Sequence, residues 1–309
     1  MKRLGLIGVG AWGQRYLETA GRRGDCQIAA TARRNVLADA NQAVPSGDWH
    51  ELIARAQTGE LDGIIAATSP EHQVEVAIAA IRANVPILVE KPLGLSREGP
   101  ERVLAALDAA REPRVLLINH IHLWAPAYRA VKAAVAEALA EGDVITTVES
   151  EGCSRGPFRA WSSLYDYGPH DLSMALDLLG ARHSVSLEHA HRMVPADSNG
   201  ELFSVHLRIG AVKVKMLVGN GAATKRRLFS VGFASGRSLV YDDLLPGSDK
   251  ATQNGEAIGT STEPPLSAVL TEFLDLIGSR CRSFERAVDA ARLSLRISEV
   301  LDDVSASAS

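Results

Sequence analysis

A chain of 309 residues is long enough for two domains of ordinary size, each with its own hydrophobic core. Its 46% hydrophobic and 23% charged residues are typical of a globular protein, and the formal net charge of -4 excludes an overall basic field that would attract nucleic acid or an anionic membrane. The cysteines Cys26, Cys153 and Cys281 lie far apart, which argues against a disulfide framework or zinc knuckle and favours a reducing, cytoplasmic environment.

The first residues superficially resemble a signal peptide, because Met1-Lys2-Arg3 precedes an apolar run. Polar residues and Trp12 interrupt that run by residue 15, so a buried first strand explains it better. No apolar stretch approaches the roughly 18 residues that span a bilayer. We therefore expect a cytoplasmic protein without a membrane or nucleic-acid partner.

The N-terminal residues predict a dinucleotide-binding turn. An apolar strand over residues 4–7 leads into Gly8-Val9-Gly10-Ala11-Trp12-Gly13, a helix follows to Gly21 or Gly24, and a second strand spans residues 26–32. A G-x-G-x-x-G string is weak by itself, but its place between strand and helix of a βαβ unit supports it. The glycines permit the tight turn, the approach of a pyrophosphate and close helix–strand packing, with the phosphates at the helix N-terminus. A purely structural glycine turn is the alternative.

Strand-like and helix-like segments then alternate along the chain. Apolar patterns predict strands over 63–68, 86–89 and 115–118, and helices over 71–81 and 100–110. Such alternation predicts an α/β fold with a doubly wound parallel sheet, whose ligands gather at the carboxyl ends of the strands.

The end of the second strand bears on which dinucleotide binds. An NAD-binding domain usually places Asp or Glu about 20 residues past the glycines, where the carboxylate accepts from the ribose 2′-hydroxyl. Here the strand ends at Ala32-Arg33-Arg34, and no acidic residue lies between Asp25 and Asp39. A guanidinium binds a 2′-phosphate that a carboxylate would repel. We therefore expect NADP held by Arg33 and Arg34, with NAD and solvated loop arginines as the alternative.

From Glu90 onwards the motifs become specific enough to indicate a family. The chain resembles the Gfo/Idh/MocA oxidoreductases, the family of glucose–fructose oxidoreductase and inositol dehydrogenase. The matching motifs are Gly8-x-Gly10-x-x-Gly13, Ala67-Thr68-Ser69-Pro70, Glu90-Lys91-Pro92, Asp166-x-Gly168-x-His170 and Pro264-Pro265-Leu266.

The resemblance implies two domains and a reaction class. A Rossmann domain over residues 1–120 would precede a substrate-binding and oligomerisation domain over residues 121–309, built on a large, mostly antiparallel open sheet. Hydride would pass between nicotinamide and a secondary alcohol or ketone of a sugar, cyclitol or sugar nucleotide. The cofactor would contact Gly8, Gly10, Ala11, Trp12, Gly13, Thr68, Pro70, Glu90 and Lys91, and the catalytic residues would be Lys91, Asp166 and His170.

Three positions depart from the family pattern. The Gly-rich stretch before the D-x-G-x-H motif is replaced by residues 161–165, Trp-Ser-Ser-Leu-Tyr. Ser173 replaces an acid, although Asp171 adjoins the histidine, and Gln73 replaces a histidine that follows the T-P turn. These changes preserve the reaction class and leave the substrate open.

The chemistry of alcohol oxidation assigns roles to the three catalytic candidates. His170 suits a general base, because an unperturbed imidazole has a pKa near about 6.5. We expect a helix to start at Gly168-Pro169, with Asp166 on the preceding loop, orienting the imidazole or a substrate hydroxyl. The Lys91 ammonium would hydrogen-bond the reacting oxygen. The alternatives are an exposed turn lysine and a histidine bonded to nearby backbone.

The second half predicts a sheet with one polar face, followed by two helices. Strands are expected over 144–151, 183–192, 202–209, 211–218, 227–233 and 238–241, and helices over 266–277 and 285–304. A further helix ends at Gly142 and places its repeating apolar residues in the core: Trp124, Tyr128, Val131, Val135 and Leu139. In the family, the open sheet face commonly joins subunits, so we expect a homo-oligomer, a dimer or tetramer.

Other polar clusters are weaker candidates. Two pairs of histidines could suggest metal binding, His189 with His191 and His120 with His122. Neither pair has an obvious third ligand nearby in the sequence, so we expect no metal site. His120 and His122 end a Rossmann strand and can border the substrate. Arg155 and Arg159 can bind an acid or phosphate on the substrate, or be solvated loop arginines.

Two other classes of function stay open. One is a glycoside hydrolase that uses a tightly held dinucleotide for transient oxidation, as in members of the same family. The other is a non-catalytic NADP(H)-sensing protein, which would have no need of the three catalytic candidates. The substrate, the direction of hydride transfer and the oligomer are not determined by the sequence.

Overall fold

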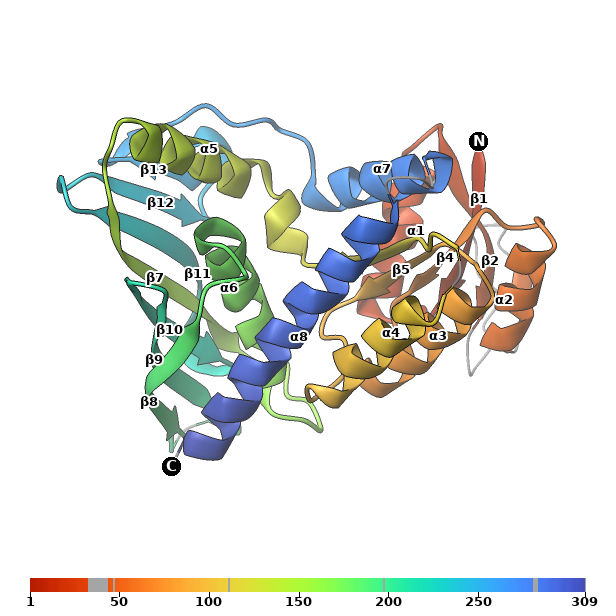
Figure 1. Cartoon of the computed structure of the whole chain (residues 1–309), viewed down its shortest axis with the longest axis horizontal. Coiled ribbons are helices and arrows are strands. Elements are labelled where there is room, and N and C mark those ends of the chain that lie inside the picture. Colours follow the sequence, from red (N-terminus) through yellow and green to blue (C-terminus); the bar gives the residue numbers. More distant parts are fainter. Residues whose placement is uncertain (33–43, 47, 111, 197, 280–282, 309) are drawn as a thin grey trace. The chain divides into compact units, whose positions relative to one another are not determined.

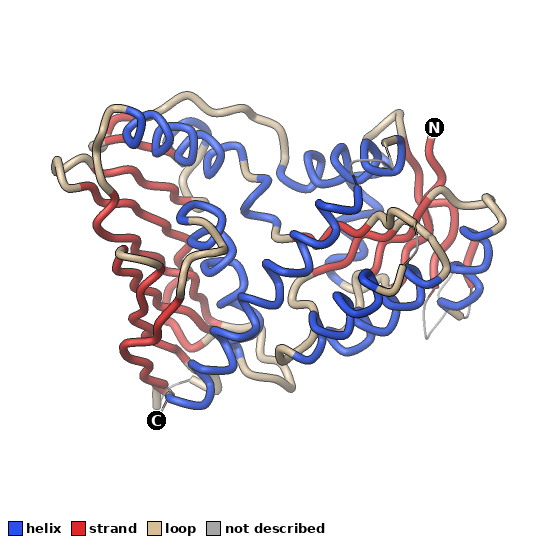
Figure 2. The backbone as a smooth tube through the Cα atoms, in the orientation of Figure 1, coloured by secondary structure: helices blue, strands red, loops and turns tan. Residues whose placement is uncertain are grey.

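The computed structural model describes residues 1–32, 44–46, 48–110, 112–196, 198–279 and 283–308. The chain forms two compact units, each assembled from two segments: Met1–Asn119 with Leu266–Leu295, and His120–Pro265 with Arg296–Ser309. Helices and strands account for most of both units (Figure 2). No helix among the described residues is long and apolar enough to cross a membrane.

The first unit is built on a parallel sheet of six strands in the order β3-β2-β1-β4-β5-β6 (Figure 1). Its strands are β1 (Lys2–Ile7), β2 (Cys26–Ala32), β3 (Val44–Ser46), β4 (Gly63–Ala66), β5 (Ile87–Glu90) and β6 (Leu116–Asn119). Its helices are α1 (Ala11–Gly21), α2 (Trp49–Gln57), α3 (Pro70–Arg82), α4 (Glu98–Asp108) and α7 (Pro265–Gly278). The chain runs from β1 outward to β2 on one side and later to β4 on the other. The strand order therefore reverses beside β1, the point where doubly wound sheets bind ligands.

Helices bury both faces of this parallel sheet, and the strands are accordingly apolar throughout. On one face, side chains such as Ile64 and Ile87 join a core with residues of α2, α3 and α4. On the other face, Phe273 and Ile277 of α7 approach the Cα of Gly63. The predicted parallel, doubly wound architecture is confirmed, and α2 and β3 are additions that the apolar pattern did not reveal.

The second unit is built on an eight-stranded sheet in the order β14-β13-β12-β11-β7-β10-β9-β8. Its strands are β7 (Ile145–Arg155), β8 (Val185–Met193), β9 (Leu202–Ile209), β10 (Val212–Gly219), β11 (Gly221–Phe233), β12 (Ser238–Asp242), β13 (Ala251–Gln253) and β14 (Glu256–Ala257). Its helical elements are η1 (Ile121–Trp124), α5 (Pro126–Ala140), α6 (Ser163–Leu179) and η2 (Gly247–Lys250), while α8 (Ser283–Ser307) has residues in both units. Only β7 and β10 pair in parallel, so the sheet is mostly antiparallel, as predicted.

One face of the second sheet carries α5 and α6 (Figure 1). Exposed lysines of β10 point to its other face. Val214 and Met216 are buried, whereas Lys213 and Lys215, which alternate with them on β10, are exposed. The predicted core of α5 is correct for Tyr128, and also for Val131 and Val135, but wrong for Leu139, which is 46% exposed. In the last turn of α5 the buried position is taken by Ala138, at 0% exposure.

Candidate active site

The glycine turn joins β1 to α1 at the reversal point of the first sheet. Gly8 has φ +87°, and a Cβ there would lie 2.4 Å from the carbonyl oxygen of Ala67. A Cβ on Gly13 would lie 2.1 Å from the Gly8 carbonyl oxygen, so helix and turn approach too closely for any side chain. Gly10 differs, because a Cβ there would meet no atom within 4 Å. The missing side chain of Gly10 therefore leaves open space for a ligand at the N-terminus of α1, rather than room for packing.

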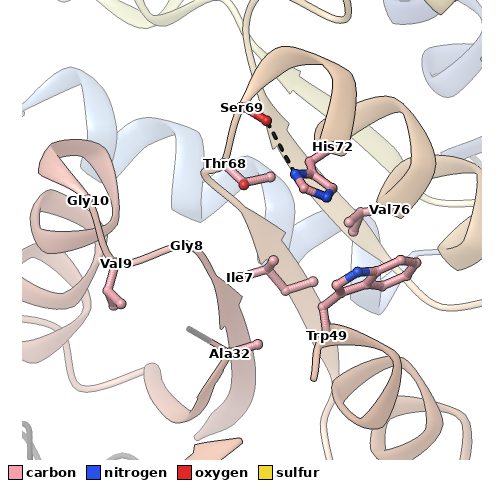
Figure 3. Close-up of a pocket in the computed structure, with 10 residues that line it drawn as sticks. All are labelled: Ile7, Gly8, Val9, Gly10, Ala32, Trp49, Thr68, Ser69, His72 and Val76. Carbon is pink, nitrogen blue, oxygen red and sulfur yellow. Dashed lines mark hydrogen bonds between the residues drawn. The ribbon is translucent and has the colours of Figure 1, made fainter. Parts of the chain in front are cut away.

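A pocket of about 640 Å³ opens beside this turn, within the first unit. Figure 3 shows Val9 and Gly10 on one side of it, and Trp49, His72 and Val76 on the other. The Ser69 hydroxyl lies 3.3 Å from His72 Nδ1. The remaining lining comes from the carboxyl ends of β1 and β2 and from the residues after β4: Ile7, Gly8, Ala32, Thr68 and Ser69. An apolar floor with a glycine turn at one end fits a dinucleotide, whose phosphates bind backbone N–H groups.

The other predicted cofactor residues in this region are placed as follows. Ala11 and Trp12 form the first turn of α1, where the Arg15 guanidinium lies 4.6 Å from the centre of the Trp12 ring. Pro70 is the first residue of α3. Arg33 and Arg34 lie outside the described residues. Trp49 was missed, because no sequence signal connected α2 with the end of β1.

Glu90 was predicted to contact the cofactor, but its carboxylate is engaged inside the first unit. Glu90 Oε1 accepts hydrogen bonds from Tyr16 Oη and from Asn119 Nδ2, both at 2.7 Å. Asn119 Nδ2 also lies 2.9 Å from Tyr16 Oη. Burial raises the pKa of Glu90, and burial together with the Glu90 charge raises the pKa of Tyr16 well above its ordinary value. The three side chains tie α1, β5 and β6 together directly before Lys91.

Lys91 follows the carboxyl end of β5, at the ligand-binding edge of the sheet. Its residue is only 8% exposed, unlike an ordinary solvated turn lysine. The backbone before it is fixed by the Glu90 hydrogen bonds. The structure therefore gives the Lys91 ammonium a defined, largely enclosed position.

In the second unit, α6 begins earlier than the sequence indicated. We expected a helix to start at Gly168-Pro169, with Asp166 on a loop, but the helix begins at Ser163 and contains Pro169 in its interior. The reason is a tertiary cap: Ser162 Oγ accepts from the Leu164 N–H, and Glu201 Oε1 accepts from the Ser163 N–H. Asp166 thus lies in the first turn of α6. His170 follows four residues later, on the same face of the helix.

His170 is 8% exposed and packs against one aromatic side chain of the second unit, which in turn contacts a tyrosine. The rings of His122 and His170 meet edge to face, with their centres 4.8 Å apart. His122 Nδ1 lies 3.0 Å from Tyr241 Oη, and burial raises the pKa of that tyrosine. His120 is also buried, at 4% exposure. His122 of η1 thus links the candidate base on α6 to Tyr241 of β12, a residue for which no sequence motif gave a signal.

Of the two predicted loop arginines, Arg159 contacts a catalytic candidate. Its Nε lies 3.4 Å from Asp166 Oδ2, and its guanidinium lies 5.5 Å from the centre of the Trp161 ring. Arg155 is the last residue of β7 and is exposed.

Asp171, next to His170, anchors α6 to the sheet. It is 3% exposed, and a Cβ on Gly152 of β7 would lie 2.2 Å from its Oδ2. Only glycine at position 152 therefore allows the carboxylate to approach the strand so closely. Burial raises the pKa of Asp171 to about 6. The adjacent Ser173 hydroxyl donates to the His170 carbonyl oxygen at 2.8 Å, so this serine is also structural.

Metal-binding side chains do not converge in the described part of the chain, where no group of three or more His, Cys, Asp or Glu residues could hold an ion. The rings of His189 and His191 are 6.5 Å apart and those of His189 and His206 are 5.9 Å apart.

Comparison with known proteins finds a family model that matches the N-terminal residues. Residues 2–120 match the model of the Gfo/Idh/MocA family, described as an oxidoreductase family with an NAD-binding Rossmann fold. Inositol 2-dehydrogenase of Paracoccus denitrificans (strain Pd 1222) is 33% identical over 148 residues, which are 44% of this chain and 41% of that protein. The rhizopine catabolism protein MocA of Rhizobium meliloti is 31% identical over 116 residues, 37% of this chain and 36% of that protein. The matched region thus spans about two fifths of the length of these relatives.

Solved structures resemble the whole chain. A protein of Magnetospirillum magnetotacticum MS-1, provisionally named an oxidoreductase, is 29% identical, with a TM-score of 0.78 over 97% of this chain and 98% of that chain. KijD10, a 3-ketoreductase from Actinomadura kijaniata crystallised with NADP and TDP-benzene, is 19% identical, with a TM-score of 0.79 over 99% of this chain and 98% of that chain. The second likeness establishes the fold alone. The N-terminal residues therefore match the Gfo/Idh/MocA family model, and the fold of the whole chain is similar to that of these solved structures.

Proposed function

We propose that the protein is an NAD(P)-dependent oxidoreductase that transfers a hydride between nicotinamide and a secondary alcohol or ketone. The substrate class is a sugar, cyclitol or sugar nucleotide, and NADP is the favoured cofactor. The observation that carries the proposal is the glycine turn, where Gly8 and Gly13 are fixed by close packing while Gly10 leaves open space beside a pocket of about 640 Å³. Inositol 2-dehydrogenases among the relatives support the substrate class.

The first unit would bind the cofactor through its own backbone and pocket. The N–H groups at the start of α1, which begins directly after Gly10, would favour an anionic pyrophosphate there. Thr68 and Trp49 line the pocket that would enclose the rest of the dinucleotide. The bound nicotinamide supplies the hydride acceptor or donor. The preference for NADP rests on Arg33 and Arg34 in the sequence.

Three side chains of the chain would handle the proton and the reacting oxygen. His170 would accept the hydroxyl proton during oxidation, and the Lys91 ammonium would donate a hydrogen bond to the oxygen as negative charge develops on it. Asp166, on the same face of α6 as His170, would hold a neighbouring substrate hydroxyl. His122 packs edge to face against His170 and would restrict rotation of the imidazole. That Lys91 and His170 serve one substrate rests on the order of the motifs, since they belong to different units.

The polar face of the eight-stranded sheet supports a further part of the proposal, a homo-oligomer. Leu217 of β10 and Leu228 of β11 lie half-buried on this face beside Glu151 of β7. A second copy of the chain would cover these apolar side chains. Sedimentation of the purified protein tests this part directly.

Paired titrations of the purified protein test the proposed function. A ligand at a hundred times its Kd should stabilise the native state by about 2.7 kcal/mol, which is a readily measured thermal shift. We expect a clear shift with NADP+ and a much smaller one with NAD+, followed by a change in nicotinamide absorbance with at least one member of a panel of sugars and cyclitols. A larger shift with NAD+ would refute the NADP preference. No shift with either, from protein shown to be free of bound nucleotide, would refute the function.

A further inference from the structure

A second pocket, of about 330 Å³, lies in the second unit at the N-terminus of α6. We name it the Arg192 pocket. Residues 158–163 form one wall, and Arg192, Val194 and Glu201 contribute to the other. Arg159, which lines the pocket, also contacts Asp166 at 3.4 Å. The pocket therefore adjoins one of the proposed catalytic residues.

The walls of the Arg192 pocket are tied together by hydrogen bonds. Glu201 accepts from Ser162 Oγ and from the Ser163 N–H, and its other oxygen accepts from Arg192 Nε at 2.8 Å. Asn220 Nδ2 donates to the Pro157 carbonyl oxygen at 2.9 Å, and Asn220 Oδ1 accepts from the Glu201 N–H at 3.1 Å. Burial alone would raise the pKa of Glu201, but these hydrogen bonds lower it, so the carboxylate stays ionised. Hydrogen bonds thus connect the segments that line the pocket.

The most exposed charged side chains that line the pocket are donors, Arg159 and Arg192. Both oxygens of Glu201 and the side-chain oxygen of Asn220 already accept hydrogen bonds. Arg159 and Arg192 each have about half of the side chain exposed, 41% and 51%, and the ion pair of each with a described residue uses only Nε. A guanidinium has five N–H donors and no acceptor. The Trp161 ring lies against the Arg159 guanidinium and limits its rotation.

This imbalance selects the chemistry of the occupant. The hydroxyl groups of a neutral sugar need acceptors as well as donors, and the side-chain oxygens of Glu201 and Asn220 already accept hydrogen bonds within the wall. A carboxylate or phosphate only accepts, and it matches the planar fork of arginine. We infer that the Arg192 pocket binds an acidic group of the substrate, so that the preferred substrate is a sugar acid, sugar phosphate or phosphate-linked sugar. Binding of an acidic group does not depend on the proposed function; only the identification of that ligand as the substrate rests on it.

Calorimetric titrations with glucose, glucuronate and glucose 6-phosphate test the inference without turnover, and the two anions distinguish carboxylate from phosphate. The variants are Arg192→Gln and Arg159→Gln. The matched control is Arg208→Gln, because Arg208 forms a similar exposed ion pair with Glu188 on the same sheet and does not line the pocket. We expect the wild-type protein to bind at least one anion about tenfold or more tighter than glucose. Arg192→Gln and Arg159→Gln should each lose about tenfold in affinity for that anion, while Arg208→Gln stays within about twofold.

Equal affinity for glucose and both anions, or no binding of any, would overturn the inference. So would an equal loss of affinity in Arg208→Gln, which would indicate a general surface charge effect. Steady-state kinetics then separate the two proposals. Anion binding that follows the variants, without oxidation or reduction of any sugar, would leave the pocket in place and remove the oxidoreductase function. Turnover of neutral sugars with no preference for the acidic ones would support the oxidoreductase function and overturn the inference about the pocket.

Discussion

The glycine turn permits a substitution that separates cofactor binding from folding. Gly10 has extended backbone, φ -72° and ψ -163°, and its Cβ would meet no atom within 4 Å, so Gly10→Ala fits the folded chain. Alanine restricts the unfolded chain more than glycine does, which stabilises the fold by about 0.4–1 kcal/mol. Alanine is also a poorer helix N-cap than glycine, which acts in the opposite direction. The free energy of unfolding should therefore change by less than about 1 kcal/mol.

The same methyl group occupies the space proposed for the pyrophosphate. We expect Gly10→Ala to raise the Kd for NADP+ at least about tenfold, equivalent to about 1.4 kcal/mol of binding energy. Gly13→Ala is the contrasting variant, because its Cβ would lie 2.1 Å from the Gly8 carbonyl oxygen. Relief of that overlap requires backbone movement, with an expected destabilisation of about 1–3 kcal/mol.

Urea denaturation without ligand measures the stability of both variants, and calorimetric titration with NADP+ and NAD+ measures binding. The reasoning fails if Gly10→Ala binds both dinucleotides as tightly as the wild type, because the turn would then not hold the phosphates. It also fails if Gly10→Ala loses as much stability as Gly13→Ala, because the space beside Gly10 would then belong to the core.

Further predictions concern catalysis, pH dependence and cofactor choice. Lys91→Ala and His170→Ala should each lower turnover at least about a hundredfold with nearly unchanged cofactor affinity; turnover within a few-fold of the wild type would remove that residue from the mechanism. Because the pKa of Asp171 is raised from 3.8 to about 6, its contribution to stability is present below pH 3.8 and is lost as the pH rises to about 6. Asp171→Asn should therefore remove up to about 3 kcal/mol of the decrease in unfolding free energy over that pH range. Urea titrations at several pH values measure this, and parallel pH profiles of variant and wild type would contradict it. Replacing Arg33 and Arg34 together by alanine should weaken NADP+ binding about tenfold or more and leave NAD+ unchanged, and an equal loss for both cofactors would exclude a role in 2′-phosphate recognition.

Local sequence patterns were sufficient for the regular elements that bury apolar faces. The strand at residues 202–209 was predicted with the bounds it has in the structure, because apolar and polar residues alternate along it. The element α2 was missed although Asp48 caps it by accepting from the His50 N–H. Its buried face is only two residues, Leu52 and Ile53, which is too few to give a clear helical period.

The candidate site was predictable where a motif fixes chemistry, and unpredictable where partners come from distant segments. The glycines, Lys91 and His170 were identified in the sequence because their motifs follow or precede recognisable elements. The start of α6 was misplaced, because the acceptor for its first N–H group is Glu201, 38 residues away from Ser163. Proline is common in the first turn of helices, so Pro169 by itself predicted a helix start. Only the hydrogen bond to the distant Glu201 shows that the helix begins earlier.

The sequence by itself determined the class of the protein: a glycine turn at the end of a buried strand, alternating elements and ordered motifs need only short-range patterns. The tertiary structure decided what surrounds each candidate residue. It buried Glu90 with Tyr16, 74 residues earlier, so that the Glu90 carboxylate accepts a hydrogen bond inside the first unit. It also placed Tyr241 against His122, 119 residues apart in the chain. Hydrogen-bond partners at such separations are selected by the packing of whole sheets and helices, and no local pattern of residues encodes them.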